Sequence, residues 1–597
     1  MLEYLSSLDT VGWDEAFYQL QAKLPAKARG IFNNVLSSRR AGWKFLLPRG
    51  ESVRALDLGC GWGCISIALA RSCGEVVSVD LTAERLRSLK EFAAFEGLQN
   101  LRFVHAGDGP LPFPDASFDL VVLNGVLEWV PDGTDGDPRE VQLRYLREVA
   151  RTLKPDGVLY VAIENRMALR YILRREDHVG LYWSSFLPRR ISDAYSRWVR
   201  GRGYRTYTYG MGGYRRLLKD SGIPATRFFC PLPDYRYPRR VSNLEPATNY
   251  PLDDNTISRW KRPFVYSFSI VAGKSVGREN GFQELIETLR QSLRKTSLAC
   301  TRYLIQKTDA ILFLKDSEGQ QYIARLPYGQ REAGRSRSNA VALRLLKEHG
   351  GVSGVAIPEI LLEERIGRDY VTVETMVPGS DLRKILRQGN SRTIQVALTD
   401  FLAAFGREHI SRRADVGRSV AAASSLSETV GRHLLDRSLR SELTVLSRQL
   451  VTRLERAECA AVWAHGDFNL GNCLWNTHTN GLQSLVDWDQ MQEDGVPGWD
   501  LVQLIGSVRR HQSKRTIADS AGDIAMNELT AEEQELWERY FTGLGVPHVE
   551  LPVVLATFWL KVTAYGFLNS SRHLSRSWVE RSIRPALSAL TRRLAAA

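Results

Sequence analysis

The sequence predicts an α/β fold with a parallel sheet in its N-terminal half, followed by an α+β unit. Between residues 53 and 163, five short apolar runs alternate with stretches of helical spacing, which is typical of a parallel sheet covered by helices. Residues 299–376 contain strand-like runs, two of which flank a turn at 316–319. Beyond residue 381, apolar residues recur mostly at helical spacing, which predicts a mainly helical end.

The first fifty residues are expected to form a helical extension, and residues 51–275 a separate domain. A strand at 265–272 is expected to close the edge of its sheet, and residues 276–298 to be a linker. The strands of this domain are expected at 53–58, 75–79, 101–105, 118–123 and 158–163, and its helices at 64–71, 83–96 and 141–153.

Composition indicates a globular chain. Hydrophobic residues make up 44% and charged residues 25% of the 597 residues, close to the globular average. We expect neither a secretory leader nor a membrane span, because no run approaches about 18 uncharged apolar residues. The seven cysteines are odd in number and include no CxxC pair, which argues against a disulfide framework and a structural zinc site. We therefore expect a cytoplasmic protein.

Positive charge is concentrated in one aromatic-rich segment. Residues 166–240 carry sixteen arginines and one lysine against five acidic residues, a net charge of +12, while the whole chain carries +13. Cations mixed with aromatic rings suit an anionic partner with groups that stack, such as a phosphorylated sugar, a nucleotide or RNA. A solvated helical surface with ordinary core aromatics is the alternative interpretation.

The run DLGCGWG lies where the first predicted strand ends and a helix begins. Gly59, Gly61 and Gly63 permit a sharp turn and a close approach of the backbone to a ligand. A dinucleotide fingerprint would need its third glycine at position 64, which is a cysteine. One strand later Asp80 can accept hydrogen bonds from ribose hydroxyls, and Asp108, after the third strand, can accept one from an adenine amino group.

In this order of motifs, residues 50–165 resemble the class I S-adenosylmethionine (SAM)-dependent methyltransferases, and the resemblance continues loosely to residue 275. It implies a Rossmann-like domain that binds SAM. In such enzymes Asp57 and the glycine turn hold the methionine part. The loop after the fourth strand, which begins at Asn124, borders the sulfonium and the acceptor.

Two residues after the fifth strand are candidates for a general base. Glu164 and His178 lie in a segment that resembles methyltransferase domains of bacterial surface-polysaccharide gene products. A sugar hydroxyl would benefit from such a base, whereas a phosphate oxygen is already anionic and needs none. A hydrogen-bonded loop histidine is the alternative for His178.

A second set of polar residues lies in the C-terminal half. His465 begins the motif HGDFNLGN, in which Asp467 can lie near an acceptor proton. Asn472 and Asp487 supply the oxygen ligands that Mg²⁺ prefers. One carboxylate near the hydroxyl and metal ligands near the phosphates are what phosphoryl transfer from ATP requires.

This motif, with VDWD downstream and Asp500 beyond it, resembles the aminoglycoside phosphotransferase-like kinases, which have a bilobal protein-kinase-like fold. The resemblance spans about residues 300–510. It implies an N-lobe at 299–376, a C-lobe at 377–597, and Asp500 as a support of the catalytic loop. The nucleotide is expected near Arg325 and Glu374, the latter on the hinge strand.

The kinase pattern is not complete. Arg325 stands where a phosphate-gripping lysine is expected, and its planar guanidinium differs from a point-charge ammonium. The following helix has no acidic residue between positions 333 and 347, and no glycine-rich loop is evident. These departures predict weak ATP binding or a rearranged phosphate grip.

The C-terminal residues 571–597 combine six arginines with apolar residues at near-helical spacing. A basic amphipathic helix of this kind can lie on an anionic membrane, which would place the protein at the inner face of the cytoplasmic membrane. Packing on the C-lobe is the alternative.

Together these patterns predict a bifunctional enzyme that uses SAM, ATP and Mg²⁺. The domain order is similar to that of enzymes that terminate bacterial O-polysaccharide chains by phosphorylating and then methylating the terminal sugar. A sugar or glycan acceptor, carried on a lipid or free, is therefore expected. Independent modification of an antibiotic or other natural product is an alternative. A second alternative is an RNA-binding methyltransferase with a non-catalytic kinase-like part. Against it, the positive charge lies beside the expected methyl-transfer site and does not form a separate nucleic-acid-binding domain.

Overall fold

The computed structural model describes residues 37–596, together with the isolated residues 16 and 20. It does not describe 108, 174, 178, 246–250, 253–256, 276–280, 387–389, 412–415, 435, 457–460, 514–527 and 570–577. The helix expected over residues 1–50 therefore lies largely outside the described residues. The chain divides into two compact units, of which unit 1 holds residues 37–333 and 361–374, and unit 2 holds 334–360 and the residues from 375 onward.

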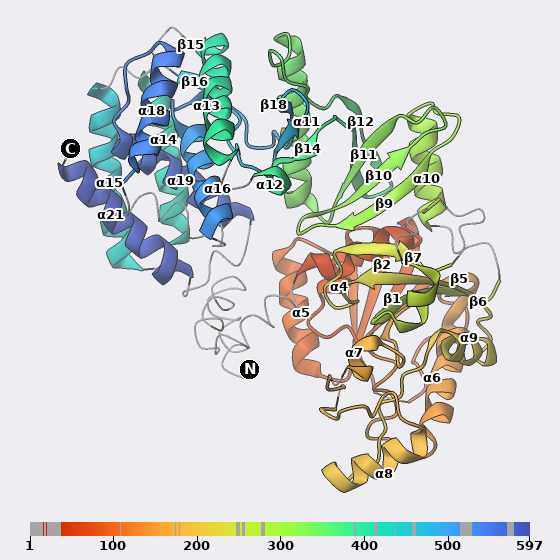
Figure 1. Cartoon of the computed structure of the whole chain (residues 1–597). Coiled ribbons are helices and arrows are strands. Elements are labelled where there is room, and N and C mark those ends of the chain that lie inside the picture. The colour runs from red at the N-terminus through yellow and green to blue at the C-terminus, as the bar shows by residue number, and fades with distance from the viewer. Residues whose placement is uncertain are drawn as a thin grey trace. The chain divides into compact units, whose positions relative to one another are not determined.

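Unit 1 is built on one sheet, which has thirteen strands in the part of the chain that the structure describes (Figure 1). Their order across the sheet is β12-β13-β11-β10-β9-β7-β6-β8-β5-β4-β1-β2-β3. The strands are β1 (Gly50–Leu58), β2 (Cys73–Asp80), β3 (Leu101–His105), β4 (Phe118–Asn124), β5 (Leu153–Glu164), β6 (Ala225–Leu232), β7 (Arg240–Asn243), β8 (Ser267–Gly273), β9 (Ala299–Ile305), β10 (Asp309–Lys315), β11 (Gln321–Pro327), β12 (Ile360–Ile366) and β13 (Asp369–Thr375).

Strands β1 to β5 confirm the predicted alternation of strands and helices. β1 pairs in parallel with β2 and β4, and the pairs β2–β3 and β4–β5 are parallel as well. Because these strands run in one direction, the residues that follow them meet at one edge of the sheet. The helices here are η1 (Ser38–Leu46), α4 (Cys64–Ala70), α5 (Ala83–Phe95), α6 (Pro138–Thr152), α7 (Leu169–Ile172), α8 (Arg189–Arg200), α9 (Met211–Asp220) and η2 (Arg259–Phe264).

Strand β8 corrects the prediction of an edge strand at 265–272. It pairs antiparallel with β5 on one side and with β6 on the other, so it lies inside the sheet. The prediction was wrong because the aromatic-rich run at 225–232 also forms a strand and covers the free side of β8.

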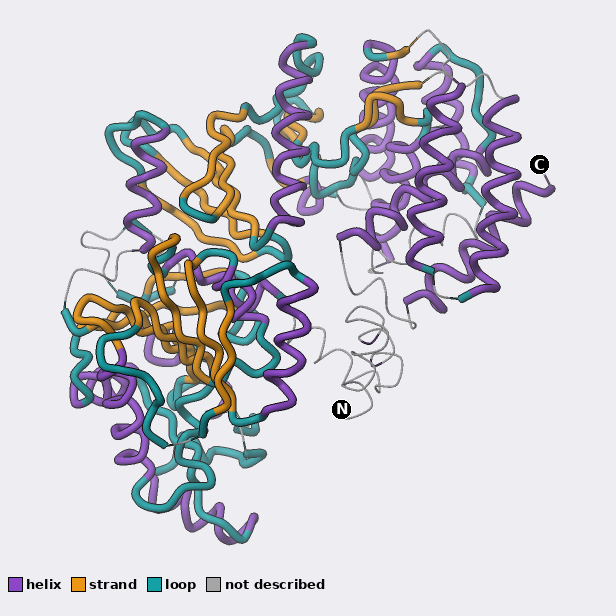
Figure 2. The backbone as a smooth tube through the Cα atoms, turned by 180° about the vertical axis from the view of Figure 1, so that it is seen from behind, coloured by secondary structure: helices purple, strands orange, loops and turns teal. Residues whose placement is uncertain are grey.

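The expected linker at 276–298 is also corrected. It contains helix α10 (Gly281–Ser292), whose apolar side chains are buried. Beyond it β9 pairs with β7, with Val241 opposite Tyr303, so the strands of residues 299–327 continue the N-terminal sheet. Figure 2 shows the strands of this unit in orange. One hydrophobic core extends from Trp43 to Val373, and it joins the N-terminal domain to the expected N-lobe.

A buried ionic cluster lies in the same core. Lys44 Nζ is 3.2 Å from Asp369 Oδ1 and donates to Ser72 Oγ at 2.6 Å. Ser72 Oγ donates to the same Asp369 oxygen at 2.7 Å, and Arg49 Nε is 3.4 Å from its other oxygen. This cluster ties η1 and the end of α4 to the start of β13.

Unit 2 is mainly helical and contains two small sheets, β14-β17-β18 and β15-β16-β19. The helices are α11 (Gln330–Glu348), which begins in unit 1, α12 (Leu382–Ile385), α13 (Ser391–Glu408), α14 (Val416–His433), α15 (Arg437–Arg456), α16 (Trp499–Ser513), α18 (Ala531–Leu544), α19 (Leu551–Asn569), η6 (Val579–Ile583) and α21 (Arg584–Ala596). The strands are β14 (Ser380–Asp381), β15 (Ile410–Ser411), β16 (Ala461–Ala464), β17 (Cys473–Asn476), β18 (Gly481–Leu485) and β19 (Gln492–Gly495).

Two helices of unit 2 bear on membrane contact. Residues 551–568 of α19 are long and apolar enough to cross a membrane, but 72% of this window is buried in the structure, as in a core helix. Helix α21 packs on α15 and α19. Its Leu587, Leu590 and Leu594 are buried, so the apolar face that the sequence offered to a membrane is covered. Part of the basic segment, 571–577, lies outside the described residues.

Candidate active sites

The glycine turn after β1 forms a cradle at the carboxyl edge of the parallel strands. Gly59, Gly61 and Gly63 all have positive φ angles, of 69°, 57° and 82°. A Cβ on Gly59 would collide with Val126, and one on Gly63 would lie 2.0 Å from a methyl carbon of Leu89. A Cβ on Gly61 would meet no atom within 4 Å, so this glycine faces open space where a ligand can approach the backbone.

Two carboxylates flank this turn. Asp80, at the end of β2, accepts hydrogen bonds from the backbone N–H groups of Gly61 at 2.8 Å and Thr82 at 2.9 Å. Asp57 is fully buried near the end of β1 and accepts from Ser66 Oγ at 2.6 Å. Burial raises the pKa of Asp57 to about 6, although the hydrogen bond from Ser66 opposes the shift.

Asn124 ends strand β4 at the same edge. Both polar atoms of its side chain are buried, and neither has a hydrogen-bond partner among the described residues. Buried amides without partners are rare, because each lost hydrogen bond is costly. The open cradle at Gly61, the oriented Asp80 carboxylate and this amide therefore fit an adenosyl ligand with a polar methionine end. Asp108 and His178 lie outside the described residues.

Glu164 ends strand β5, but it does not offer an accessible base. It is buried and accepts from Tyr266 Oη at 2.8 Å, from Tyr171 Oη and from the Arg236 guanidinium. A base must take a proton from the acceptor, whereas this carboxylate is held by three partners. The structure corrects the role expected of Glu164: it anchors Arg236.

The residues around Glu164 form a basic site. Its Arg170 and Arg236 belong to the segment 166–240, which the sequence predicted to meet an anionic partner, whereas Tyr266 lies outside that segment. Arg236 Nη2 donates to Tyr266 Oη at 2.6 Å, and the Arg170 guanidinium lies 4.1 Å from the centre of the Tyr266 ring. Tyr235 reaches the loop after β4, where its hydroxyl donates to Glu128 at 3.4 Å. Tyr235 and Arg236 both come from the sequence run PDYRYP.

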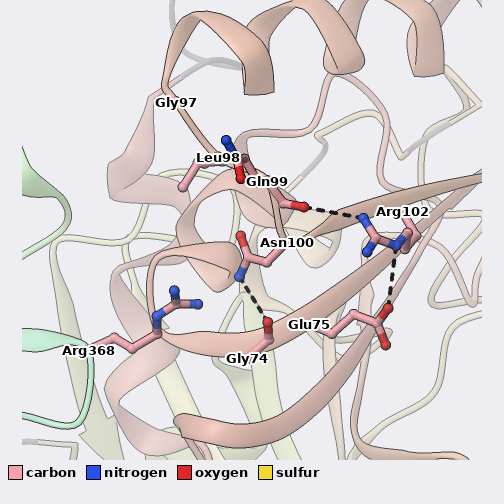
Figure 3. A pocket seen from close by; sticks show the side chains of 8 residues that line it. All are labelled: Gly74, Glu75, Gly97, Leu98, Gln99, Asn100, Arg102 and Arg368. Carbon is pink, nitrogen blue, oxygen red and sulfur yellow. Dashed lines mark hydrogen bonds and ion pairs between the residues drawn. The ribbon is translucent and has the colours of Figure 1, made fainter.

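A pocket of about 420 Å³ lies elsewhere on unit 1, at the amino ends of β2 and β3 (Figure 3). Three of its polar side chains donate hydrogen bonds to backbone carbonyl groups of the protein. Asn100 donates to the carbonyl of Gly74 at 3.3 Å, Arg102 donates to that of Gln99 at 3.2 Å, and Arg368 donates to that of Cys73 at 2.7 Å. This pocket is therefore not part of the cradle at the carboxyl edge.

Arg325 of β11 and Glu374 of β13 form an ion pair in unit 1. Arg325 Nη2 lies 3.1 Å from Glu374 Oε1, and Arg325 Nη1 lies 3.8 Å from Asp309 Oδ2. The kinase pattern expects the carboxylate partner on the following helix, where this chain has no acid. The neighbouring strand supplies that partner here.

In unit 2, side chains from helices α16 and α19 hold the backbone of the predicted catalytic loop. The Asp500 carboxylate accepts from the backbone N–H groups of His465 at 2.7 Å and Gly466 at 2.9 Å, which matches the supporting role expected of it. Lys561 of α19 donates to the carbonyl of Gly466. It is the lone charged residue of an apolar helix stretch, which was the signal that could have found it.

Asp467, in the same loop, is partly buried. Gln503 Nε2 donates to Asp467 Oδ1 at 2.9 Å, and Asn472 Nδ2 donates to Asp467 Oδ2 at 3.2 Å. Burial raises the pKa of Asp467, while the charge of His465 opposes the shift. The structure thus brings Asp467 and Asn472 together as predicted, and Gln503 is a partner that sequence reasoning missed.

The expected metal ligands are one amide and one carboxylate. The amide nitrogen of Asn472 is used by Asp467, which leaves its carbonyl oxygen as an acceptor. Asp487, the second residue of the VDWD turn, has a φ of +62°. Within the described residues no three His, Cys, Asp or Glu side chains gather as a metal site. Two oxygen donors fit Mg²⁺, which keeps several waters and phosphate oxygens as further ligands.

Asp489 of the same turn connects the loop to helix α11. Its Oδ2 accepts from Arg335 Nε at 2.7 Å and from Tyr565 Oη at 3.0 Å. The side chain of Asn339, also on α11, accepts from the Trp488 N–H at 2.9 Å. Helix α11 thus holds the metal-side turn through Arg335 and Asn339.

Two families of known proteins match two parts of this chain. Residues 56–161 match the family described as methyltransferase domain, and residues 308–535 match the phosphotransferase enzyme family. The chain carries a methyltransferase domain and a phosphotransferase-family domain. The first is Rossmann-like and the second kinase-like, as predicted.

Two curated relatives are methyltransferases. Demethylmenaquinone methyltransferase of Geobacillus kaustophilus is 34% identical over 134 residues, which are 21% of this chain and 53% of the relative. That of Staphylococcus aureus is 35% identical over 164 residues, 26% of this chain and 62% of the relative. The chain thus spans between half and two thirds of the length of these relatives.

Two solved structures illustrate the similarities. The YcgJ protein of Bacillus subtilis is 20% identical, with a TM-score of 0.26, over 40% of this chain and 99% of that one. The streptomycin–ATP–APH(2")-IIa complex is 13% identical, with a TM-score of 0.34, over 52% of this chain and 97% of that one.

Proposed function

We propose that this chain is a bifunctional enzyme that phosphorylates a hydroxyl of a sugar or glycan terminus with ATP and then methylates the new phosphate with SAM. The presence of a methyltransferase and a phosphotransferase domain in one chain supports two transfers to one acceptor. The observation that carries the coupling is the basic site formed by Arg170, Arg236 and Tyr266.

This basic site lies beside the place expected for methyl transfer. Tyr235 packs on the loop after β4, where a Cβ on Gly125 would be 2.9 Å from the tyrosine hydroxyl oxygen. Its neighbour Arg236 is held by Glu164 at the end of β5. Guanidinium groups bind phosphate oxygens with planar, paired hydrogen bonds. A phosphorylated acceptor therefore finds two arginines next to the donor cradle.

The engaged state of Glu164 also favours a phosphate acceptor. A sugar hydroxyl must lose its proton as it attacks, so it benefits from a free base. A phosphate oxygen already carries negative charge, and the sulfonium is a good leaving group. Holding the two in line supplies most of the rate. Asp57, the glycine turn and Asn124 orient the donor, and the arginines orient the acceptor.

For phosphoryl transfer, Asp467 receives the proton of the acceptor hydroxyl. Its burial and raised pKa make proton acceptance easier than for an exposed aspartate. Asn472 and Asp487 would hold Mg²⁺, which neutralises charge on the ATP phosphates. Gln503 and Asn472 fix the orientation of the Asp467 carboxylate, and Asp500 fixes the loop that carries it.

The test uses the full chain, a panel of glycan acceptors, and ATP and SAM with different labels. We expect methyl incorporation only when ATP is present. Asp467→Asn should remove phosphate and methyl labels together, and a chemically phosphorylated acceptor should restore the methyl label. Glu493→Gln, an exposed carboxylate change near the loop, is the matched control. Equal methylation with and without ATP would overturn the coupling.

A further inference from the structure

Helix α8 turns apolar side chains outward and small polar ones inward. Ile191, Trp198 and Val199 are 52%, 84% and 50% exposed, whereas Ser192 and Ser196 are fully buried. The serines are satisfied inside, since Ser192 Oγ donates to the Ser184 carbonyl at 2.6 Å and Ser196 Oγ to the Arg202 carbonyl at 2.9 Å. An ordinary surface helix has the opposite arrangement.

The outward residues form one continuous stripe. Positions 191, 195, 198 and 199 have the i, i+4, i+7, i+8 spacing of a single helix face. The rings of Tyr195 and Trp198 are 6.5 Å apart, which agrees with that spacing. The loop before the helix exposes two further aromatic side chains, Trp183 and Phe186. An exposed apolar stripe on a helix indicates a binding surface.

Arginines lie beside this stripe and at its end. Arg190 and Arg197 flank it on one side, and Arg200 and Arg202 follow at its end. Asp193 is the single acidic residue of the helix, and it pairs with Arg197 at 2.9 Å. The segment 166–240 as a whole carries a net charge of +12. The complementary partner is therefore apolar where the stripe touches it and anionic around the contact.

The composition of the stripe distinguishes a bilayer from a free glycan. Sugars stack on aromatic rings and need hydrogen-bond donors and acceptors beside them, whereas Ile191 and Val199 offer only branched hydrocarbon. Aliphatic and tryptophan side chains on one face with arginines at its border are the pattern of a helix that lies in a membrane interface. Tryptophan prefers the headgroup level, and arginine attracts anionic lipids.

The position of helix α8 in unit 1 suits contact with a membrane. It follows β5 in the chain, and Figure 1 shows it beyond α7, away from the sheet. The donor cradle, Asn124 and Glu164 lie at the carboxyl ends of the same parallel strands. Helix α8 therefore follows in the chain the edge of the sheet at which methyl transfer is proposed.

We infer that helix α8 docks this protein on a membrane surface that contains anionic lipids. This inference does not rest on the proposed acceptor or on either reaction. The stripe inserts among the headgroups, and the arginines around it bind lipid phosphates.

The experiment measures sedimentation of the full chain with vesicles of phosphatidylcholine alone and of phosphatidylcholine mixed with phosphatidylglycerol. We expect binding to the anionic vesicles, which weakens as salt is raised. The double variant Ile191→Ser/Trp198→Ser should lose about tenfold or more in affinity, because it removes the inserted apolar area. Arg190→Gln should lose about fivefold, with the stripe intact.

Trp260→Ser is the matched control. Trp260 is 70% exposed and lies next to Arg259 and Lys261, but it is outside the α8 stripe. We expect this variant to sediment like the wild type. Equal sedimentation of the Ile191→Ser/Trp198→Ser variant and the wild type would overturn the inference. So would a wild-type dimer that this variant converts to monomer without any change in vesicle binding, since a second copy would then cover the stripe.

Discussion

Arg325 and Glu374 pair across the neighbouring strands β11 and β13, with 3.1 Å between Arg325 Nη2 and Glu374 Oε1. Arg325, the residue expected to bind the ATP phosphates, is thus paired with a carboxylate on a strand. The kinase pattern expects that carboxylate on the following helix. Glu374 is buried, so this pair is a fixed feature of unit 1 and differs from a solvated surface contact.

We predict that Arg325 and Glu374 act as one element in ATP use. Arg325→Gln and Glu374→Gln should each lower kcat/KM for ATP, mainly by raising KM. The double variant should lose little more than the stronger single variant, because both changes break one interaction. Steady-state kinetics at varied ATP concentration on the wild type and the three variants gives the double-mutant cycle. Lys315→Gln, on strand β10 next to β11, is the control. Losses that add fully would show that the two side chains act separately.

Gly61 and Gly63 should respond differently to the same substitution. Gly61→Ala adds a methyl group in open space, at a strained φ that costs about 1 kcal/mol, so the protein should fold and lose SAM affinity. Gly63→Ala places a Cβ 2.0 Å from Leu89 and should lower the unfolding temperature more. Thermal unfolding and calorimetric titration with SAM separate the two effects. If Gly61→Ala bound SAM with wild-type affinity, SAM would not bind at this glycine turn.

Asp57 should make unit 1 less stable as pH rises from about 4 to 6. Its folded pKa of about 6 lies above the ordinary value of 3.8, so in this range the folded chain holds a proton that the unfolded chain has released. The free energy of unfolding therefore falls as pH rises, by at most about 1.4 kcal/mol per pH unit. Asp57→Asn should make this slope in urea unfolding smaller by the contribution of Asp57. Asp135→Asn, an exposed carboxylate, should retain it; an unchanged slope in Asp57→Asn would contradict the assignment.

Asp369 should be the most sensitive charge in the buried cluster. Asp369→Asn leaves Lys44 and Arg49 buried without a carboxylate partner, which should cost about 3–5 kcal/mol of stability. Chemical denaturation of the full chain measures this loss. Glu287→Gln breaks the exposed helix pair with Arg290 and should have no measurable effect. Equal midpoints for the two variants would show that the cluster contributes no net stability.

Local sequence patterns predicted the helices and strands well, but they did not predict which strands pair in the sheet. The alternation of strands and helices, the glycine turn and the loop at Asp467 are all confirmed, because each depends on residues close in sequence. Helix α10 was missed in the predicted linker, although Phe282, Leu285 and Leu289 have helical spacing. The pairing of β7 with β9 and the partner of Arg325 join residues about fifty or more positions apart, and no local pattern encodes such contacts.

The surfaces of helices show the same limit. The spacing of residues 571–597 left open both membrane contact and packing on the C-lobe, and the structure buries the apolar face of helix α21 against α15 and α19. Helix α8 has an equally clear stripe but exposes it. Periodicity reports that a helix has an apolar side, and only the surrounding fold decides whether protein or another medium covers it.

The β7–β9 pairing has a practical consequence for dissecting the chain. Cutting near residue 280 to obtain a separate phosphotransferase would strip β9 of its neighbour and leave Tyr303 and Tyr328 facing water. It would also open a row of unpaired backbone groups, which promotes aggregation. A soluble fragment with kinase activity would have to retain the N-terminal sheet, so catalytic knockouts by point mutation are the appropriate way to study either half.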